Sequence, residues 1–356
     1  MTISEATAKI KPIDDKYIKL SQERLDSLTK PRGSLGKLED FAKRLCAVYQ
    51  TDMPEMPKKG VFVFAGDHGV VEEGVSAYPS EVTPQMVFNF LRGGAGINVL
   101  ARHAGADVFV IDMGVNYVFK DCPGLINKKV VSGTKNMCKG PAMSTDDAVS
   151  TIEAGISLAE EYAKKGYRLF GTGDMGIGNT TPSSAITAVL TGLSPQAVTS
   201  RGTGIDDAAL AKKIKAIETA LTVNKPDRHN ALDVLSKVGG AEIGGIAGLC
   251  IGAASLGIPV VVDGFISTAG AAIACVLDKR VSAYLIGSHM SQEGGHKPLL
   301  NFMGVEPLFD FNMRLGEGTG AALAMTVLDA SLKIYREMAT FAEAMVSDTD
   351  KDIHKT

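Results

Sequence analysis

The chain has little net charge and few cysteines, and each shortage argues against a class of protein. Its 356 residues carry a formal net charge of −3, with a sequence pI of about 6.1, so no long-range field draws it toward nucleic acid or an anionic membrane. The five cysteines form no CxxC pair, which argues against a disulfide framework or a zinc site and fits a reducing compartment. We therefore expect a cytoplasmic protein that binds neither nucleic acid nor membrane.

Apolar segments of membrane-spanning character are also scarce. The first eleven residues lack the apolar core of a signal peptide. Residues 243–262 carry no charge and approach the length of a membrane span, but many glycines and Pro259 interrupt them. We predict that this stretch forms a buried helix followed by a buried parallel strand at residues 260–262.

Short apolar runs recur along the chain and often end in a small or acidic residue. They lie at residues 61–65, 108–111, 169–170, 260–262 and 284–286, with amphipathic segments between them. Buried strands that alternate with helices predict a mainly parallel α/β sheet. Ligands bind beyond the carboxyl ends of such strands, so we expect a site where Asp67, Asp112, residues 171–182, Asp263 and residues 288–291 meet.

The two ends of the chain are rich in helix signals and have no strand signal. We expect residues 1–55 and a C-terminal helix at 321–346 to form a small helical domain, residues 56–320 to form an α/β catalytic domain, and residues 347–356 to be a frayed tail.

Two glycine-rich segments each present one carboxylate. Residues 171–182 contain Asp174, and residues 314–320 contain Glu317. Flanking glycines let the backbone turn sharply and approach a ligand, and the exposed amides suit an anion such as phosphate. A carboxylate in such a loop is placed to accept a proton, so the pair suggests an enzyme that acts on a phosphorylated small molecule.

Each of these features also has a structural interpretation. Glu317 would stabilise the dipole of the helix that follows it, although Arg314 nearby is a usual phosphate ligand. Asp174 would hold a tight loop together. Asp67-His68 is an acid/base or metal candidate, but a buried structural pair is favoured because no HxxE or HxH pattern accompanies it. Lys213 lies between Lys212 and Lys215, and the simplest prediction for it is a solvated surface residue.

Taken together, the motifs resemble the nicotinate-nucleotide–dimethylbenzimidazole phosphoribosyltransferases. The matching segments cover nearly the whole chain in order: residues 30–39, 66–69, 74–79, 171–182, 233–240, 262–265, 288–289 and 314–320. The resemblance implies a large domain with a mainly parallel, Rossmann-like sheet flanked by helices, plus a small helical domain from both chain ends. It also implies a homodimer, with a heterodimer with a paralogue as the alternative.

The resemblance implies transfer of the phosphoribosyl group of nicotinate mononucleotide to 5,6-dimethylbenzimidazole, giving α-ribazole 5′-phosphate and nicotinate. Glu317 would be the general base and Asp174 a second catalytic residue. The phosphate and ribose would be bound by Gly176, Asn179, Thr180, Lys213, Asp263, Ser291, Arg314 and Gly316, and the base pocket would be lined by Tyr78, Pro79, Met86 and Leu315. No metal or cofactor is expected, because nicotinate leaves from a ring that already carries positive charge.

One departure from the family and three alternatives stay open. Many family members carry glutamate where this chain has Asp174, so the carboxylate is withdrawn by about 1.5 Å and a second-base role is in doubt. Some relatives use phenol or p-cresol as the acceptor and work as heterodimers, and Glu317 would suit that chemistry as well. A non-catalytic partner subunit and, more distantly, a dinucleotide-binding oxidoreductase complete the alternatives.

Overall fold

The computed structural model describes residues 1–202, 204 and 206–348. The chain divides into two compact units, one of residues 1–11 with 58–324 and one of residues 12–57 with the chain from Met325 onward. Residues 1–11, which the sequence suggests for the small domain, thus belong to the large unit. There Arg280 donates hydrogen bonds to the carbonyls of Ile10 (2.8 Å) and Thr7 (2.9 Å) just after and within helix α1 (Ile3–Lys9).

Seven parallel strands form the sheet of the large unit, in the order β3-β2-β1-β4-β5-β6-β7. Their bounds are β1 Lys58–Gly66, β2 Ala106–Gly114, β3 Leu125–Asn127, β4 Tyr167–Met175, β5 Val260–Val262, β6 Leu285–His289 and β7 Pro307–Phe309. The predicted parallel α/β architecture is confirmed, and the five predicted strands are all present. The two edge strands β3 and β7 were not predicted.

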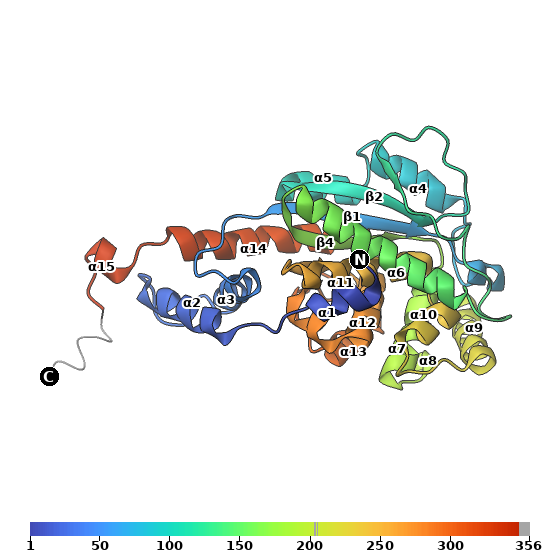
Figure 1. The fold of residues 1–356 in the computed structure, drawn as a ribbon. Coiled ribbons are helices and arrows are strands. Elements are labelled where there is room, and N and C mark those ends of the chain that lie inside the picture. The colour runs from blue at the N-terminus through green and yellow to red at the C-terminus, as the bar shows by residue number, and fades with distance from the viewer. Residues whose placement is uncertain (203, 205, 349–356) are drawn as a thin grey trace. The chain divides into compact units, whose positions relative to one another are not determined.

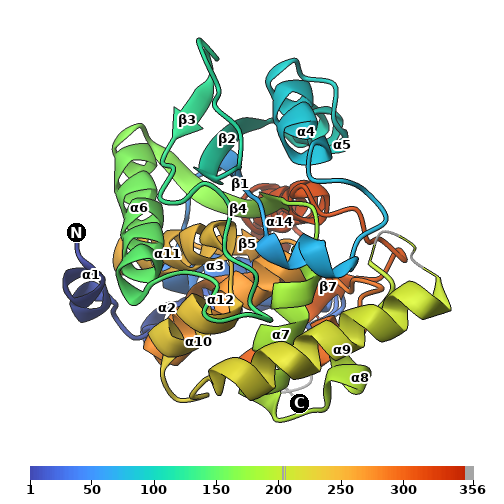
Figure 2. The same cartoon turned by 90° about the vertical axis from the view of Figure 1, so that its right-hand side faces the viewer.

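Helices cover both faces of this sheet. Helices α6 (Thr145–Lys164) and α11 (Ala241–Ser255) pack together on one face, and α5 (Gly96–Ala104) lies on the other (Figures 1 and 2). The contact between α6 and α11 requires glycine, because a Cβ on Gly248 would lie 1.9 Å from the carbonyl oxygen of Ile152. The remaining elements of this unit are η1 Gly69–Glu73, α4 Val82–Leu91, α7 Thr180–Thr191, α8 Pro195–Val198, α9 Asp207–Asn224, α10 Ala231–Val238, α12 Phe265–Leu277, η2 Lys279–Tyr284 and α13 His296–Met303.

The uncharged stretch at residues 243–262 forms the predicted helix and strand. Helix α11 is buried along nearly its whole length, and β5 follows it as a buried parallel strand. The lack of charge in residues 243–262 therefore reflects burial of this stretch within the protein. Among the described residues, no helix is both long enough and apolar enough to cross a membrane.

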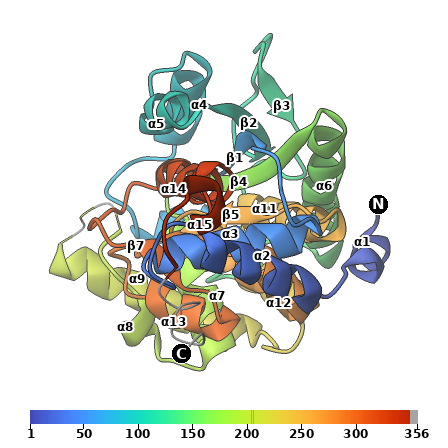
Figure 3. The same cartoon turned by 90° about the vertical axis from the view of Figure 1, so that its left-hand side faces the viewer.

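The second unit is helical (Figure 3). It holds α2 (Asp15–Ser27), α3 (Lys37–Tyr49), the part of α14 (Thr319–Glu337) from Met325 onward, and α15 (Phe341–Ala344). Its core contains Leu25, Leu28, Ala42, Cys46 and Tyr335. The expected single helix at 321–346 is interrupted at residues 338–340, where Thr340 caps α15 by accepting from the amide of Glu343. Of the expected tail, residues 349–356 lie outside the described part of the chain.

The strand order places a topological switch point between β1 and β4. From β1 the chain proceeds to β2 and β3 on one side, and from β4 to β5, β6 and β7 on the other. Ligands of open parallel sheets bind beyond the carboxyl ends of the strands at such a point. A ligand site is therefore expected at the carboxyl ends of β1 and β4 and of the strands beside them.

Candidate active site

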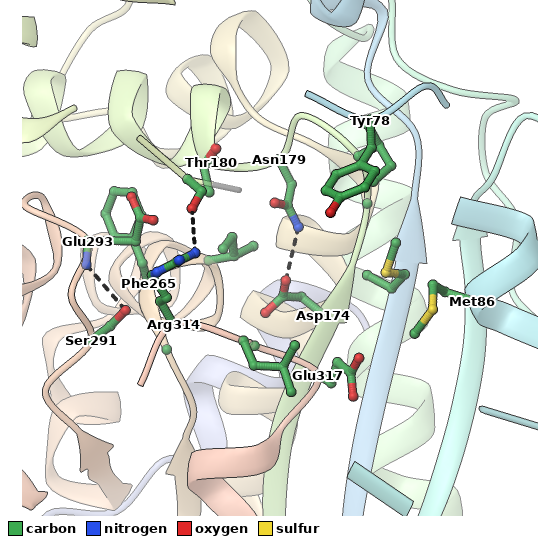
Figure 4. A pocket seen from close by; sticks show the side chains of 18 of the residues that line it. Tyr78, Met86, Asp174, Asn179, Thr180, Phe265, Ser291, Glu293, Arg314 and Glu317 are labelled. Carbon is green, nitrogen blue, oxygen red and sulfur yellow. Dashed lines mark hydrogen bonds between the residues drawn. The ribbon is translucent and has the colours of Figure 1, made fainter. Parts of the chain in front are cut away.

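A cavity of about 720 Å³ lies where the loops after β4, β5 and β6 meet the segment before α14 (Figure 4). Of the residues predicted for the site, it is lined by Tyr78, Met86, Asp174, Gly176, Asn179, Thr180, Ser291, Arg314, Leu315, Gly316 and Glu317. Of the predicted substrate-contacting residues, Pro79, Lys213 and Asp263 are not part of this lining. Asp67 and Asp112, which were also expected at these strand ends, do not line it either; Asp112 accepts from the amide of Val115 and pairs with Lys129. The cavity therefore brings together predicted residues from well-separated parts of the chain.

Residues 171–176 have the spacing Gly-x-Gly-x-x-Gly, which in dinucleotide-binding proteins opens a helix directly after a strand. Here Gly171 and Gly173 lie inside β4, and α7 begins only at Thr180. Two of these glycines instead allow close approach of other backbone segments. A Cβ on Gly173 would lie 2.5 Å from the carbonyl oxygen of Glu317, and one on Gly176 would lie 2.2 Å from that of Gly66. The spacing thus gives no support to a dinucleotide site.

The segment that carries Glu317 has an unusual backbone. Gly316, Glu317 and Gly318 have φ values of +78°, +62° and +94°, a conformation that residues other than glycine rarely adopt. Asp263 holds the segment in place, since its Oδ2 accepts from the amide of Gly318 and its Oδ1 from that of Ala321, both at 3.0 Å. Asp263 is buried, and both of its oxygens serve the start of α14.

The carboxylate of Glu317 lines the cavity and is nearly buried, with 6% of the residue exposed. Its Oε2 accepts a hydrogen bond of 3.2 Å from the amide of Ile97, in the first turn of α5. Burial raises the pKa of Glu317, the charge of Asp263 adds to this, and the amides of Ile97 and Gly96 act in the opposite direction. The result is a fixed carboxylate whose proton affinity exceeds that of an ordinary glutamate, as a general base requires.

Asp174 projects into the same cavity from the end of β4 (Figure 4). Its Oδ2 accepts a hydrogen bond of 2.9 Å from the side-chain amide of Asn179, whereas no described residue donates to its buried Oδ1. Burial, reinforced by the charge of Asp263, raises the pKa of Asp174 well above its ordinary value, although the bond from Asn179 lowers it. Burial therefore shifts the pKa of Asp174 in the same direction as that of Glu317.

Lys213 is not the solvated residue that its neighbours suggest. It lies on the buried face of α9, 1% exposed, and its Nζ donates to Thr180 Oγ1 at 2.7 Å and to the Ser200 carbonyl at 3.2 Å. Burial lowers its pKa to about 8, even though Glu293 acts to raise it. The lysine therefore stands directly behind Thr180, in the wall of a smaller cavity of about 40 Å³ that it shares with Arg201 and residues 176–180.

Apolar side chains are spread around the cavity, with Tyr78 and Met86 on one side and Phe265 on the side of Arg314 and Glu293 (Figure 4). Val82, Ile177, Ile266 and Leu315 also belong to the lining. Tyr78 and Leu315 are 52% and 60% exposed, so an aromatic ligand that contacts these side chains would remove apolar surface from water. The cavity thus combines carboxylates, cationic neighbours and an apolar surface suited to a flat ring.

Behind the cavity, His68 pairs with Glu242 rather than with its neighbour Asp67. His68 Nε2 lies 2.7 Å from Glu242 Oε1, and both residues are buried. Burial alone would lower the pKa of His68, but the charge of Glu242 and its hydrogen bond, with a smaller contribution from Asp67, raise it. Asp67 Oδ2 accepts from the amide of Asn116 at 2.8 Å. The structural interpretation of both residues is supported, and no group of three metal-binding side chains occurs among the described residues.

The comparison with known proteins identifies the class. A family profile described as "Phosphoribosyltransferase" matches residues 10–346, and the chain belongs to this family.

Within the family, two similar curated proteins bear the same name. The chain is 58% identical over 346 residues to the nicotinate-nucleotide–dimethylbenzimidazole phosphoribosyltransferase of Geotalea uraniireducens, with 97% of this chain and 98% of the relative covered. It is 57% identical over 348 residues to that of Geobacter sulfurreducens, with 98% and 99% covered. Among solved structures, CobT from Thermus thermophilus superposes with a TM-score of 0.90 at 46% identity, covering 93% of this chain and 99% of CobT.

The hydrogen bonds of Asp263 generate a test of its role. Asp263→Asn would place an NH2 group opposite one of the two backbone amides, and a lost bond to a buried charged group costs about 1–3 kcal/mol. We expect the free energy of unfolding in urea to fall by that amount. An unchanged free energy would mean that the carboxylate is not needed to hold the start of α14, and would return Asp263 to the substrate-binding residues.

Proposed function

We propose that this chain transfers the phosphoribosyl group of nicotinate mononucleotide to 5,6-dimethylbenzimidazole, releasing nicotinate and forming α-ribazole 5′-phosphate for cobamide assembly. The observation that carries the proposal is the fixed carboxylate of Glu317 in a cavity that also holds apolar side chains and phosphate-binding residue types. The family membership and the shared name of the relatives support it.

In this proposal Glu317 is the general base. An imidazole nitrogen of the incoming base attacks C1′ of the ribose with inversion while Glu317 accepts the proton from the other ring nitrogen. Its negative charge also favours the cationic character that develops on the ring, and its bond to the Ile97 amide keeps the carboxylate in one orientation. General-base catalysis of this kind contributes about 10²–10⁴-fold. Asp174, whose buried Oδ1 has no hydrogen-bond partner among the described residues, is proposed to form a hydrogen bond with the substrate rather than to act as a second base.

The phosphate is proposed to bind at the start of α7. Asn179 and Thr180 begin this helix, whose dipole favours an anion. Lys213 supports Thr180 from behind, and Arg314 lies in the same cavity with its Nη1 donating to the Gly202 carbonyl at 3.1 Å. Gly176, Ser291 and Gly316 complete the proposed phosphate and ribose contacts. We assign Asp263 to positioning Glu317, because its oxygens are occupied by backbone amides.

The acceptor is proposed to stack on the apolar lining, in contact with Tyr78, Met86 and Leu315. A phenolic acceptor such as phenol or p-cresol would use the same base and the same donor. We further propose that the chain works in the cytoplasm as a homodimer, and gel filtration of the isolated active chain distinguishes this from a heterodimer with a paralogue.

A competition assay tests the function directly. The purified chain receives nicotinate mononucleotide with equimolar dimethylbenzimidazole, benzimidazole, adenine, phenol and p-cresol, and the products are identified by mass spectrometry. We expect a benzimidazole riboside phosphate as the main product. A phenolic riboside phosphate would keep the mechanism and change the acceptor, while the absence of any product would contradict the proposal for the isolated chain.

Replacing Glu317 tests the general base. Glu317→Gln preserves the shape of the side chain and an oxygen for the Ile97 amide but cannot accept a proton, so we expect kcat to fall about 10²–10⁴-fold while nicotinate mononucleotide still binds. The measurement is steady-state turnover together with calorimetric binding of the donor. Near-normal turnover in this variant would rule out Glu317 as the base.

The raised pKa of Glu317 predicts the acid side of the pH profile. A base must be deprotonated, so turnover is retained above its pKa and is lost as the pH falls through it. Because burial raises that pKa, the decline should occur at a higher pH than for an ordinary glutamate. The measurement is kcat as a function of pH in the wild-type protein, at saturating donor and acceptor. A profile that stays flat down to the ordinary range of a glutamate would contradict this assignment.

A further inference from the structure

Glu293 is a buried carboxylate in the cavity with no role in the site described so far. It lies on the loop between β6 and α13, only 6% of the residue is exposed, and it belongs to the cavity lining (Figure 4). No described residue donates a hydrogen bond to its buried Oε2. A buried acceptor without a donor is costly in free energy, and the cavity is where a ligand would supply the missing donor.

The loop that carries Glu293 is held in one conformation by a chain of hydrogen bonds. The Ser291 amide donates to His296 Nδ1 at 2.9 Å, His296 Nε2 lies 2.9 Å from Thr268 Oγ1, and the Thr268 hydroxyl donates to the Gly264 carbonyl at 2.8 Å. This order requires a neutral His296 with its proton on Nε2. Burial supports that state by lowering its pKa to about 3.

Two further contacts fix the same loop on its other side. The amide of Gly294 donates to Ser200 Oγ at 2.6 Å, and a Cβ on Gly295 would lie 2.7 Å from the ring of Phe265. The carboxylate of Glu293 is therefore presented to the cavity by a preorganised support, as specific binding requires.

The charges around Glu293 indicate what kind of group it receives. Burial raises its pKa, and the cations that act in the opposite direction are Lys213 and Arg314. A phosphate or carboxylate group would be repelled by the Glu293 carboxylate at contact distance. A neutral hydroxyl, by contrast, would donate a hydrogen bond to the open oxygen, and the phosphate could still lie near the two cations.

We infer that Glu293 accepts a hydrogen bond from a ribose hydroxyl of the donor substrate and makes the site specific for ribosyl over deoxyribosyl donors. The inference rests on the proposed function. In nicotinate mononucleotide the phosphate and the carboxylate are acceptors at neutral pH, so the 2′ and 3′ hydroxyls are the donors available to Glu293. Removing either partner leaves the other without its hydrogen bond.

A cycle of substrates and variants tests this pairing. We would measure kcat/KM for nicotinate mononucleotide and for its 2′-deoxy and 3′-deoxy analogues with the wild-type protein and with Glu293→Ala. The intrinsic reactivities of the three donors cancel when the ratios of ribosyl to deoxyribosyl kcat/KM are compared between proteins. For one of the two analogues we expect this ratio to be about 10- to 100-fold smaller in Glu293→Ala, the value of a hydrogen bond to a charged group. A ratio unchanged for both analogues would overturn the inference.

Two further variants keep the test decisive. Glu293→Gln retains the volume and a neutral acceptor, so its ratio should fall by a smaller factor, about fivefold; if Glu293→Ala does not fold, an unchanged ratio in this variant overturns the inference. Gln292→Ala is the matched control. Gln292 is the neighbour of Glu293 in the sequence, but its Nε2 donates a hydrogen bond to Asn312 Oδ1 at 2.9 Å, so this variant should keep the wild-type ratio. Failure of the wild-type protein to use nicotinate mononucleotide at all would refute the proposed function instead.

Discussion

The position of Glu317 depends on three consecutive residues with positive φ, and the rest of the site is arranged around that turn. A backbone of this kind is unfavourable for glutamate, so it persists only because its surroundings hold it. Asp263 binds the amides on its carboxyl side, Gly173 leaves room for its carbonyl, and the first turn of α5 binds its carboxylate. The turn therefore connects β4, β5, α5 and α14, and a change in any one of them would move the carboxylate of Glu317.

Charge is distributed unevenly around the cavity: carboxylates gather on one side and cations on the other. Asp174, Asp263 and Glu317 come together near the end of β4. Burial raises the pKa of all three, and the charge of Asp263 adds to this for Asp174 and Glu317, whereas His289 and backbone amides lower the pKa of Asp263. Lys213 and Arg314 act on Glu293, nearer the phosphate-binding residue types. In the proposed reaction, such a field would orient a donor that has an anionic phosphate and a cationic pyridinium, with its phosphate toward the cations and its reacting carbon toward the carboxylates.

The central sheet could be predicted from the sequence because strands buried on both faces read as continuous apolar runs. The runs at 61–65, 108–111 and 260–262 lie within β1, β2 and β5. The edge strands β3 and β7 have only three residues each, all intermediate or exposed, so no apolar pattern distinguishes them from loops. The interruption of the C-terminal helix was also unpredictable from the absence of glycine and proline alone, since a capping threonine was enough to start a new helix.

The site could be predicted only as far as its residues are recognisable by type and local spacing. Asp174, Arg314 and Glu317 stand in glycine-rich segments and were found that way. The polar face of a helix predicts solvent for Lys213, and only tertiary packing shows that α9 buries this face against Thr180.

Glu242, Glu293 and His296 have no local signal, because each acts through a partner far away in the sequence or through the cavity itself. The role of Asp263 is likewise not predictable from the local sequence. The sequence correctly predicts that Asp263 lies at the end of a strand. It does not reveal that both of its carboxylate oxygens accept hydrogen bonds from backbone amides. A carboxylate at a strand end can thus bind the backbone beside a cavity without lining the cavity, and only the hydrogen bonds of the folded chain reveal this.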